Sequence, residues 1–237
     1  MPNKLNNQGK RYMQNIRDAI KAVQERIEKA CARSGRAASE VRLIGVTKRV
    51  DIGRIKEAMA CGLKDFGENY IQEAKKKIEE ITTCEEINWH MIGHIQTNKV
   101  KFLPGMFGYI HSVDRWELAE LLDRYGKGMN VLFELNLSGE VTKQGTTVDN
   151  LKKMLERIGQ LKNIRPVGLM TMAPFVDDPE DVRGVFGRLR ERLYEANREF
   201  SLNMTELSMG MSSDFEVAIE EGATMVRVGT AIFGERI

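Results

Sequence analysis

The sequence predicts an α/β fold, a single (β/α)8 TIM-type barrel with an additional N-terminal helix. Eight short apolar segments are spaced along the chain, and amphipathic segments with helical periodicity lie between them. Strands that alternate with helices form parallel βαβ units, and eight of them favour a closed barrel over an open doubly wound sheet. The 237 residues match the usual size of one barrel, and no linker or low-complexity tract divides them. We therefore expect residues 1–237 to form one domain.

The first predicted element is a helix that precedes all the strands. Apolar residues from Ile16 to Cys31 recur every three or four positions, and Gly35 suits the helix end. The polar segment 1–10 is expected to be flexible, and it lacks the apolar core of a signal peptide. The strands are predicted at 42–47, 65–67, 87–92, 109–113, 131–137, 166–170, 206–208 and 225–228.

Helices are predicted between these strands. Asp51 is suited to cap a helix that ends at Gly62. Apolar residues with helical spacing mark a second helix at 151–158. Asp178 followed by Pro179 is a typical helix start, and the apolar face continues beyond it.

Composition and charge exclude several classes of protein. The 36 basic and 34 acidic residues give a formal net charge of +2, so neither nucleic acid nor an anionic membrane is an expected partner. No apolar run approaches the roughly 20 residues that span a bilayer. Cys31, Cys61 and Cys84 have neither metal-site nor disulfide spacing, which is typical of free thiols in a reducing cytoplasm. We expect a soluble, cytoplasmic protein.

Lys48 is the first candidate functional residue. It directly follows the first predicted strand, and barrel enzymes place their chemistry at the carboxyl ends of the strands. Partial desolvation lowers the pKa of a lysine and frees its amine to attack an aldehyde. The alternative is that Lys48 begins a solvated loop beside Arg49.

A candidate phosphate site lies near the end of the chain. Ser212 belongs to a turn between a strand and a helix, where backbone amides suit an anion. Ser213 and Glu216 have the spacing of a capping box. Asp214 and Glu216 oppose an anion unless their side chains fold back to cap the helix. A capped helix without any ligand is the alternative.

The next strand adds to this phosphate prediction. Alternation places Arg227 opposite Val226 and Val228, toward the barrel interior, and Gly229-Thr230 offers a second turn with backbone amides. Barrels often build phosphate sites from the loops after strands seven and eight. A buried arginine salt bridge is the alternative for Arg227.

The histidines do not predict a metal site, and the methionines near the strand ends predict packing. His90 lies in a strand candidate that ends at Gly93, so His90 and His94 are not expected to share a metal. Hydrogen-bonded structural histidines are the simpler interpretation. Methionines near the strand ends are expected to pack as adaptable filler; they are Met170, Met172, Met209 and Met211.

Six motifs together resemble a known family. They are GVTK at 45–48, FGENYIQE at 66–73, WHMIGHIQTNK at 89–99, GLMTM at 168–172, LSMGMS at 207–212 and VRVGTAIFG at 226–234. In this order they resemble the pyridoxal phosphate homeostasis proteins, the YggS/PROSC family. That family's fold is similar to the barrel domain of alanine racemase, the fold-type III arrangement for pyridoxal 5′-phosphate (PLP).

The resemblance implies a role for each matching residue. It implies that Lys48 carries PLP as a Schiff base and that Asn69 lies beside the cofactor. Arg227 would approach the pyridine ring and disfavour protonation of the ring nitrogen, which makes the ring a weak electron sink. The stretch around Met211 and Ser212, with Gly229 and Thr230, would hold the phosphate.

Three further residues have less definite roles by resemblance. His90 and Asn98 would support the wall of the site. Lys143 is a second lysine in a family-like loop, with a solvated lysine as the alternative. Residues 49–51 are the main local difference from the family pattern, and we expect them to affect only the rim.

The predicted function is that of a non-enzymatic, monomeric protein in PLP homeostasis, which carries, buffers or releases the cofactor. PLP-dependent apoenzymes are the expected protein partners. One alternative is a racemase-like PLP enzyme, although no tyrosine follows Tyr194 to serve as a second acid/base before the sequence ends at Ile237. Another is a phosphate-binding barrel enzyme without a covalent cofactor.

Overall fold

The computed structural model describes residues 15–81, 86–126, 128–138 and 144–234. The segment 1–10, which the sequence predicts to be flexible, lies outside these residues, as do Cys84 and Lys143. Cys31 is buried and Cys61 is partly buried, and both are free thiols. Within the described residues, no helix combines the length and the apolar character needed to cross a membrane.

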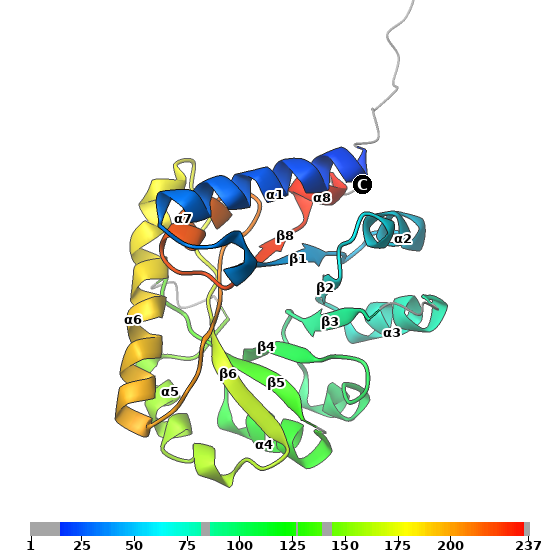
Figure 1. Ribbon diagram of the computed structural model, residues 1–237. Coiled ribbons are helices and arrows are strands. Elements are labelled where there is room, and N and C mark those ends of the chain that lie inside the picture. Colours follow the sequence, from blue (N-terminus) through cyan, green and yellow to red (C-terminus); the bar gives the residue numbers. More distant parts are fainter. Residues whose placement is uncertain (1–14, 82–85, 127, 139–143, 235–237) are drawn as a thin grey trace, which may run out of the picture.

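Eight parallel strands close into a barrel in sequence order, and β1 is hydrogen-bonded to both β2 and β8 (Figure 1). The predicted closed (β/α)8 barrel is therefore confirmed. The strands are β1 (Arg42–Val46), β2 (Asp65–Glu68), β3 (Asn88–Met91), β4 (Tyr109–Val113), β5 (Met129–Glu134), β6 (Ile164–Met170), β7 (Glu206–Ser208) and β8 (Met225–Val228).

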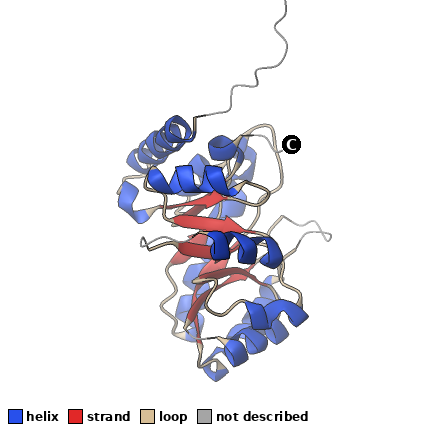
Figure 2. Ribbon diagram, turned by 90° about the vertical axis from the view of Figure 1, so that its right-hand side faces the viewer, coloured by secondary structure: helices blue, strands red, loops and turns tan. Residues whose placement is uncertain are grey.

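Helices enclose the strands on the outside of the barrel (Figure 2). The α-helices are α1 (Ile16–Arg33), α2 (Ile52–Ala60), α3 (Ile71–Glu80), α4 (Trp116–Tyr125), α5 (Val148–Leu155), α6 (Arg183–Phe200), α7 (Phe215–Glu220) and α8 (Thr230–Phe233). Short 3-10 helices are η1 (Ala38–Glu40), η2 (Thr97–Phe102), η3 (Ile158–Gln160) and η4 (Pro179–Val182).

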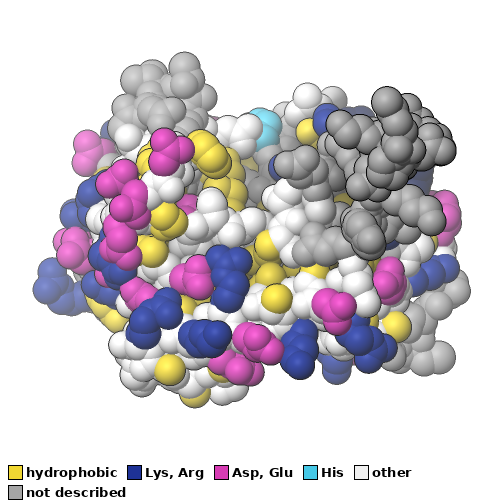
Figure 3. Space-filling model, turned by 90° about the horizontal axis from the view of Figure 1, so that it is seen from above, with side chains coloured by type: hydrophobic (Ala, Val, Ile, Leu, Met, Phe, Trp, Pro, Cys, Tyr) yellow, Lys and Arg dark blue, Asp and Glu magenta, His cyan; other side chains and the backbone are white. Residues whose placement is uncertain are grey.

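Helix α1 is the predicted N-terminal helix, and it lies across α7 and α8 (Figure 1). The side chain of Asn15 accepts a hydrogen bond from the backbone N–H of Arg17 and so caps the helix start. The predicted apolar face is buried from Ile16 to Cys31. The outer surface seen in Figure 3 carries interspersed acidic and basic side chains, as the near-neutral net charge predicts.

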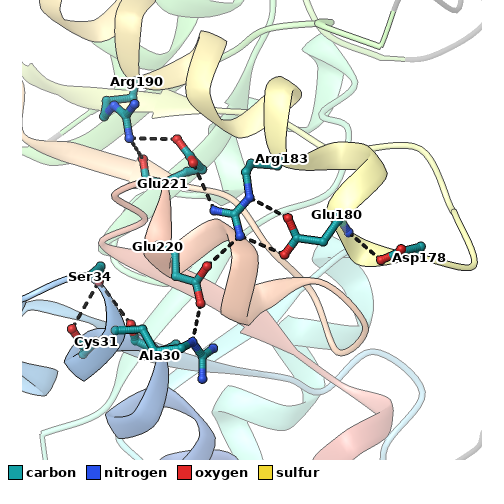
Figure 4. A network of polar contacts seen from close by, with 10 residues as sticks. Ala30, Cys31, Ser34, Asp178, Glu180, Arg183, Arg190, Glu220 and Glu221 are labelled. Carbon is teal, nitrogen blue, oxygen red and sulfur yellow. Dashed lines mark hydrogen bonds and ion pairs between the residues drawn. The ribbon is translucent and has the colours of Figure 1, made fainter.

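A network of charged residues joins α6 to α7, the helix that follows the predicted phosphate turn (Figure 4). Arg183 donates to Glu180, Glu220 and Glu221, and Glu220 also accepts from Arg33 at 2.6 Å. The hydrogen bond from Arg183 is the largest cause that lowers the pKa of Glu220. The network fixes α7 against both α1 and α6.

Several predicted boundaries differ from the structure by a few residues, and two of the differences have a clear cause. The strand predicted at 131–137 ends at Glu134, because the following backbone bonds with Thr146 instead: Thr146 N donates to Glu134 O and Asn136 N donates to Thr146 O. The helix predicted to begin at Asp178 starts as η4, where the Asp178 side chain accepts from Glu180 N at 3.0 Å.

Candidate functional site

A cavity of about 320 Å³ opens at the carboxyl ends of the strands. Residues at the ends of β1, β2, β3, β6, β7 and β8, or just after them, line it, which is the position expected for the active site of a barrel. The lining residues are Val46, Lys48, Asn69, Ile92, Met172, Phe175, Met211, Ser212, Ser213, Arg227, Gly229 and Thr230.

The structure brings most of the predicted site residues together in this cavity. They come from three separate regions of the sequence and are Lys48, Asn69, Met211, Ser212, Arg227, Gly229 and Thr230. Phe175 is a lining residue that the sequence did not single out, and it is 87% exposed on the loop after β6. No motif or periodicity distinguishes this aromatic residue from a core phenylalanine.

Lys48 lies in a tight turn directly after β1. Thr47 N continues the ladder by donating to Gly67 O at 2.9 Å, and Val50 N then donates to Thr47 O at 2.9 Å. Arg49 adopts a left-handed conformation with φ of 58°. The chain therefore reverses at Lys48, and its side chain lines the cavity.

A buried polar cluster supports this turn from behind. Lys77 Nζ donates to Thr47 O at 2.6 Å, to Glu68 Oε1 at 2.7 Å and to Glu73 Oε1 at 2.6 Å. Thr47 Oγ1 also donates to Glu68 Oε1, and Arg49 N donates to Glu73 Oε1. Burial raises the pKa of Glu68, while its bonds to Lys77 and Thr47 oppose this rise. Sequence patterns gave no sign of this cluster, because Lys77 reads as one lysine of an exposed helix.

Asn69 directly follows β2 and lines the cavity. Its backbone lies so close to Gly93 that a Cβ atom there would be 2.4 Å from Asn69 O. Among the described residues, Asn69 Oδ1 is buried without a hydrogen-bond partner. Because a buried polar atom is normally paired, this side chain is suited to bind a ligand.

The turns after β7 and β8 converge at Ser212. The backbone N–H groups of Gly229 and Ala231 donate to Ser212 Oγ at 3.3 and 3.4 Å. Gly210 has φ of 90°, and a Cβ atom there would lie 2.7 Å from the Cβ of Ala218, so only glycine suits the turn. This arrangement joins one hydroxyl and two amides beside the cavity, which is chemistry that suits a phosphate.

The predicted capping box at Ser213 and Glu216 is wrong. Helix α7 has Asp214 as its N-cap residue, without a side-chain cap bond. Glu216 is drawn away by an ion pair with Arg26 at 2.7 Å, and Asp214 Oδ1 accepts from Met211 N at 2.6 Å. Both carboxylates therefore have partners of their own, which removes the main objection to an anion at this turn.

Arg227 is buried and 4% exposed, as the strand alternation predicts. Its Nη1 donates to Ser208 Oγ at 2.5 Å and its Nη2 donates to Thr171 O at 2.9 Å, so both contacts are with uncharged oxygens. Burial lowers the pKa of Arg227 to about 10, against the opposing effects of Asp214 and Glu134. The guanidinium stays charged at neutral pH and borders the cavity.

Two residues assigned to the site wall lie elsewhere. His90 is fully buried in the barrel interior, bonded to Asp65 and His111, and does not line the cavity. Asn98 is exposed on η2. His94 Nδ1 lies 3.6 Å from Asp114 Oδ2. Within the described ranges, no group of three or more potential metal ligands occurs.

Known proteins share this fold and much of this sequence. The chain matches the family model of the alanine racemase N-terminal domain over residues 19–237. It is 47% identical over 226 residues to the pyridoxal phosphate homeostasis protein of Aquifex aeolicus, with 94% of this chain and 99% of that protein covered.

Solved structures agree with this relationship. PipY of Synechococcus elongatus PCC7942, solved with PLP bound, is 38% identical with a TM-score of 0.79, and the match covers 90% of this chain and 100% of that chain. Alanine racemase of Corynebacterium glutamicum is 17% identical with a TM-score of 0.67 over 93% of this chain and 61% of that chain, which shows the shared fold alone. The chain therefore belongs to the family of pyridoxal phosphate homeostasis proteins, built on the barrel of the alanine racemase N-terminal domain.

Proposed function

We propose that the chain binds PLP in the cavity at the barrel mouth and takes part in PLP homeostasis. The observation that carries this proposal is that Lys48, Ser212 and Arg227 border one cavity although they are far apart in sequence. The amine nitrogen of Lys48 replaces the aldehyde oxygen of PLP, and a water molecule leaves as the Schiff base forms. The PLP-bound structure of PipY supports this choice of ligand.

The phosphate group of PLP fits the turns after β7 and β8. Ser212 and Thr230 offer hydroxyl groups, and the backbone amides of Gly229 and Ala231 already point at the Ser212 oxygen. Met211 lies in the same turn and contributes its backbone and an adaptable side chain to the wall. A phosphate bound here would gain several hydrogen bonds from groups that the fold holds in place.

The ring of PLP would lie between Lys48 and Arg227, with Asn69 beside it. The amide oxygen of Asn69, which has no hydrogen-bond partner among the described residues, marks a polar group that a ligand would complete. When bound, PLP supplies an electron sink for bonds at an amino-acid α-carbon, and this sink is strongest when the ring nitrogen is protonated. The positive charge of Arg227 opposes that protonation, so the site favours holding PLP over using it.

We therefore propose a carrying, buffering or releasing role without efficient catalysis. The name of the Aquifex aeolicus relative supports this role, and the charge of Arg227 gives it a physical basis. A racemase-like enzyme is the second candidate, favoured by the shared fold with alanine racemase. The sequence favours a cytoplasmic monomer that delivers PLP to PLP-dependent apoenzymes.

Borohydride reduction tests the central claim. Purified protein incubated with PLP should absorb in the visible region, and reduction should leave one pyridoxyl group on the peptide that contains Lys48. Lys48→Ala should lose the label and keep the fold, while Lys76→Ala, an exposed lysine of α3, should label normally. A pyridoxyl group found mainly on Lys143 or another lysine would overturn the assignment.

A further inference from the structure

A continuous chain of hydrogen bonds crosses the barrel interior and ends at Arg227. His90 Nε2 lies 3.0 Å from Asp65 Oδ1, and His90 Nδ1 lies 2.9 Å from His111 Nε2. His111 Nδ1 lies 2.8 Å from Ser208 Oγ, which accepts from Arg227 Nη1 at 2.5 Å. Asp65 begins β2 and borders a second cavity at the opposite end of the barrel, so this chain connects the two ends.

The direction of every hydrogen bond in this chain is fixed by its two ends. Burial lowers the pKa of His90 and lowers that of His111 further, so both rings are neutral and each carries one proton. A carboxylate oxygen only accepts, so Asp65 places the proton of His90 on Nε2 and leaves Nδ1 as an acceptor. His111 must then donate from Nε2, and its bare Nδ1 accepts the Ser208 hydroxyl proton.

Arg227 therefore meets a hydroxyl whose proton is already used in the hydrogen bond to His111 Nδ1. Ser208 Oγ presents only lone pairs to the guanidinium, which has donors alone. A buried arginine without a bonded carboxylate needs such acceptors to hold its charge in one place. In the opposite arrangement the bare Nε2 of His90 would face the Asp65 carboxylate, and two acceptors would repel each other.

We propose that Asp65, His90 and His111 are positioning residues that fix Arg227 at the cavity wall through Ser208. The proposal rests on PLP as the ligand of that cavity, and it adds three residues that lie outside the site. A purely apolar interior would fill the same space without loss, since buried polar groups cost free energy unless they are all paired. The position of Arg227, the charged group next to the ligand, therefore explains why the barrel interior contains these hydrogen-bonded polar residues.

The first experiment reads the protonation pattern in the protein without cofactor. Two-dimensional NMR of the histidine rings, with ¹⁵N label, should show the proton on Nε2 and a bare Nδ1 in both His90 and His111. The guanidinium resonances of Arg227 should show restricted rotation in the wild type and free rotation in His111→Phe. A charged ring, or a proton on Nδ1 of either ring, would overturn the proposal. Because no PLP is present, this result does not depend on the proposed function.

The second experiment is a double-mutant cycle on PLP affinity. His111→Phe should weaken PLP binding on the order of tenfold, as expected for a misplaced hydrogen bond to a charged group. In an Arg227→Leu background the same His111→Phe change should have no further effect, because its target is gone. An equal loss in both backgrounds would indicate a general structural role and refute the proposal. His94→Phe is the matched control, because His94 takes no part in this series of hydrogen bonds.

Variants at the far end keep the test open if His111→Phe does not fold. Asp65→Asn retains an oxygen that accepts from His90 Nε2 and should preserve both the ring protonation and the PLP affinity. Asp65→Leu removes that acceptor and should lower PLP affinity, again only while Arg227 is present. Equal PLP affinity for Asp65→Leu and wild type would refute the proposal, and a wild type that binds no PLP would instead refute the proposed function.

Discussion

Lys77 Nζ lies 2.6 Å from the carbonyl oxygen of Thr47, the residue directly before Lys48. Helix α3 thereby holds the turn that presents Lys48 to the cavity. The same ammonium pairs with Glu68 and Glu73, and the side chains of Lys77 and Glu68 are 6% and 0% exposed. A cation this buried is costly to remove because its carboxylate partners stay behind.

Lys77→Met should therefore weaken both the fold and the site. We expect a loss of about 3–5 kcal/mol in the free energy of unfolding, the usual cost of breaking a buried ion pair from one side. The rate of Schiff base formation with PLP should fall as well, because the turn at Lys48 loses its anchor. Chemical denaturation and stopped-flow absorption measure the two effects.

The neighbouring Lys76 provides the matched control for this prediction. It is exposed on α3, so Lys76→Met should change the free energy of unfolding by no more than about 0.5 kcal/mol. The double variant with Glu68→Gln should recover part of the stability lost in Lys77→Met, since it removes the unpaired carboxylate. If Lys76→Met and Lys77→Met behave alike, the cluster does not support the turn.

Removing a hydroxyl from the proposed phosphate site should weaken cofactor retention. Ser212→Ala and Thr230→Ala should each lower PLP affinity by roughly ten- to a hundredfold, because a hydrogen bond to a charged group is lost. Ser39→Ala, an exposed serine at η1, should bind PLP like the wild type. Equilibrium dialysis against PLP and against pyridoxal provides the measurement, and equal affinity for the two ligands would contradict a phosphate site.

Stability should fall as pH rises through neutrality because of Glu134. Burial raises the pKa of this carboxyl to about 7, with Asp114 adding to the rise and Arg227 opposing it. Its Oε2 is buried without a hydrogen-bond partner in the described part of the chain. The folded protein therefore keeps a proton that the unfolded chain releases near its ordinary pKa of 4.5. The stabilisation is complete below that value and is lost as pH rises through about 7.

Glu134→Gln should remove this part of the pH dependence. Between about pH 5 and about pH 8, the free energy of unfolding of the wild type should fall relative to the variant by on the order of 3 kcal/mol. Urea denaturation at several pH values gives the difference profile. Glu57→Gln, on the exposed face of α2, should follow the wild type at every pH. Parallel profiles for wild type and Glu134→Gln would show that Glu134 does not hold the proton.

Purified protein with PLP should not turn over amino acids efficiently. If PLP binds as proposed, the charge of Arg227 would disfavour a protonated ring nitrogen, and racemisation needs acid/base groups on both faces of the substrate α-carbon. Exchange of the α-proton in deuterated water, measured across many amino acids against free PLP, is the assay. A rate near the roughly 10 s⁻¹ typical of enzymes, lost in Lys48→Ala, would favour the racemase-like alternative.

Local order in the sequence was enough to predict the barrel and most of the cavity. Lys48, Gly229 and Thr230 each follow a strand, and a parallel barrel brings all such positions to one end. The strand alternation also predicted the burial of Arg227. These features depend only on periodicity and on position relative to a strand end.

Contacts between distant side chains were beyond the same reasoning. His111 and Ser208 are 97 positions apart, and a buried strand residue looks alike in sequence whether it packs or bonds. The capping box at Ser213 and Glu216 failed for a similar reason, because Arg26 on α1 takes the glutamate away. Periodicity shows which way a side chain points, and it does not show which partner arrives from another strand.

The site also lies beside the junction at which the first and last strands of the barrel meet. β1 pairs with β8, and Ile44 is in register with Arg227. A ligand bonded both to Lys48, after β1, and to the turn after Arg227, at the end of β8, would link these two strands. Its binding free energy would add to the closure of the ring, because no form in which β1 and β8 have separated offers the complete site. PLP binding would therefore protect β8 from local unfolding. If β8 did unfold, the phosphate group of PLP would lose its contacts with the protein, even while the bond to Lys48 persisted.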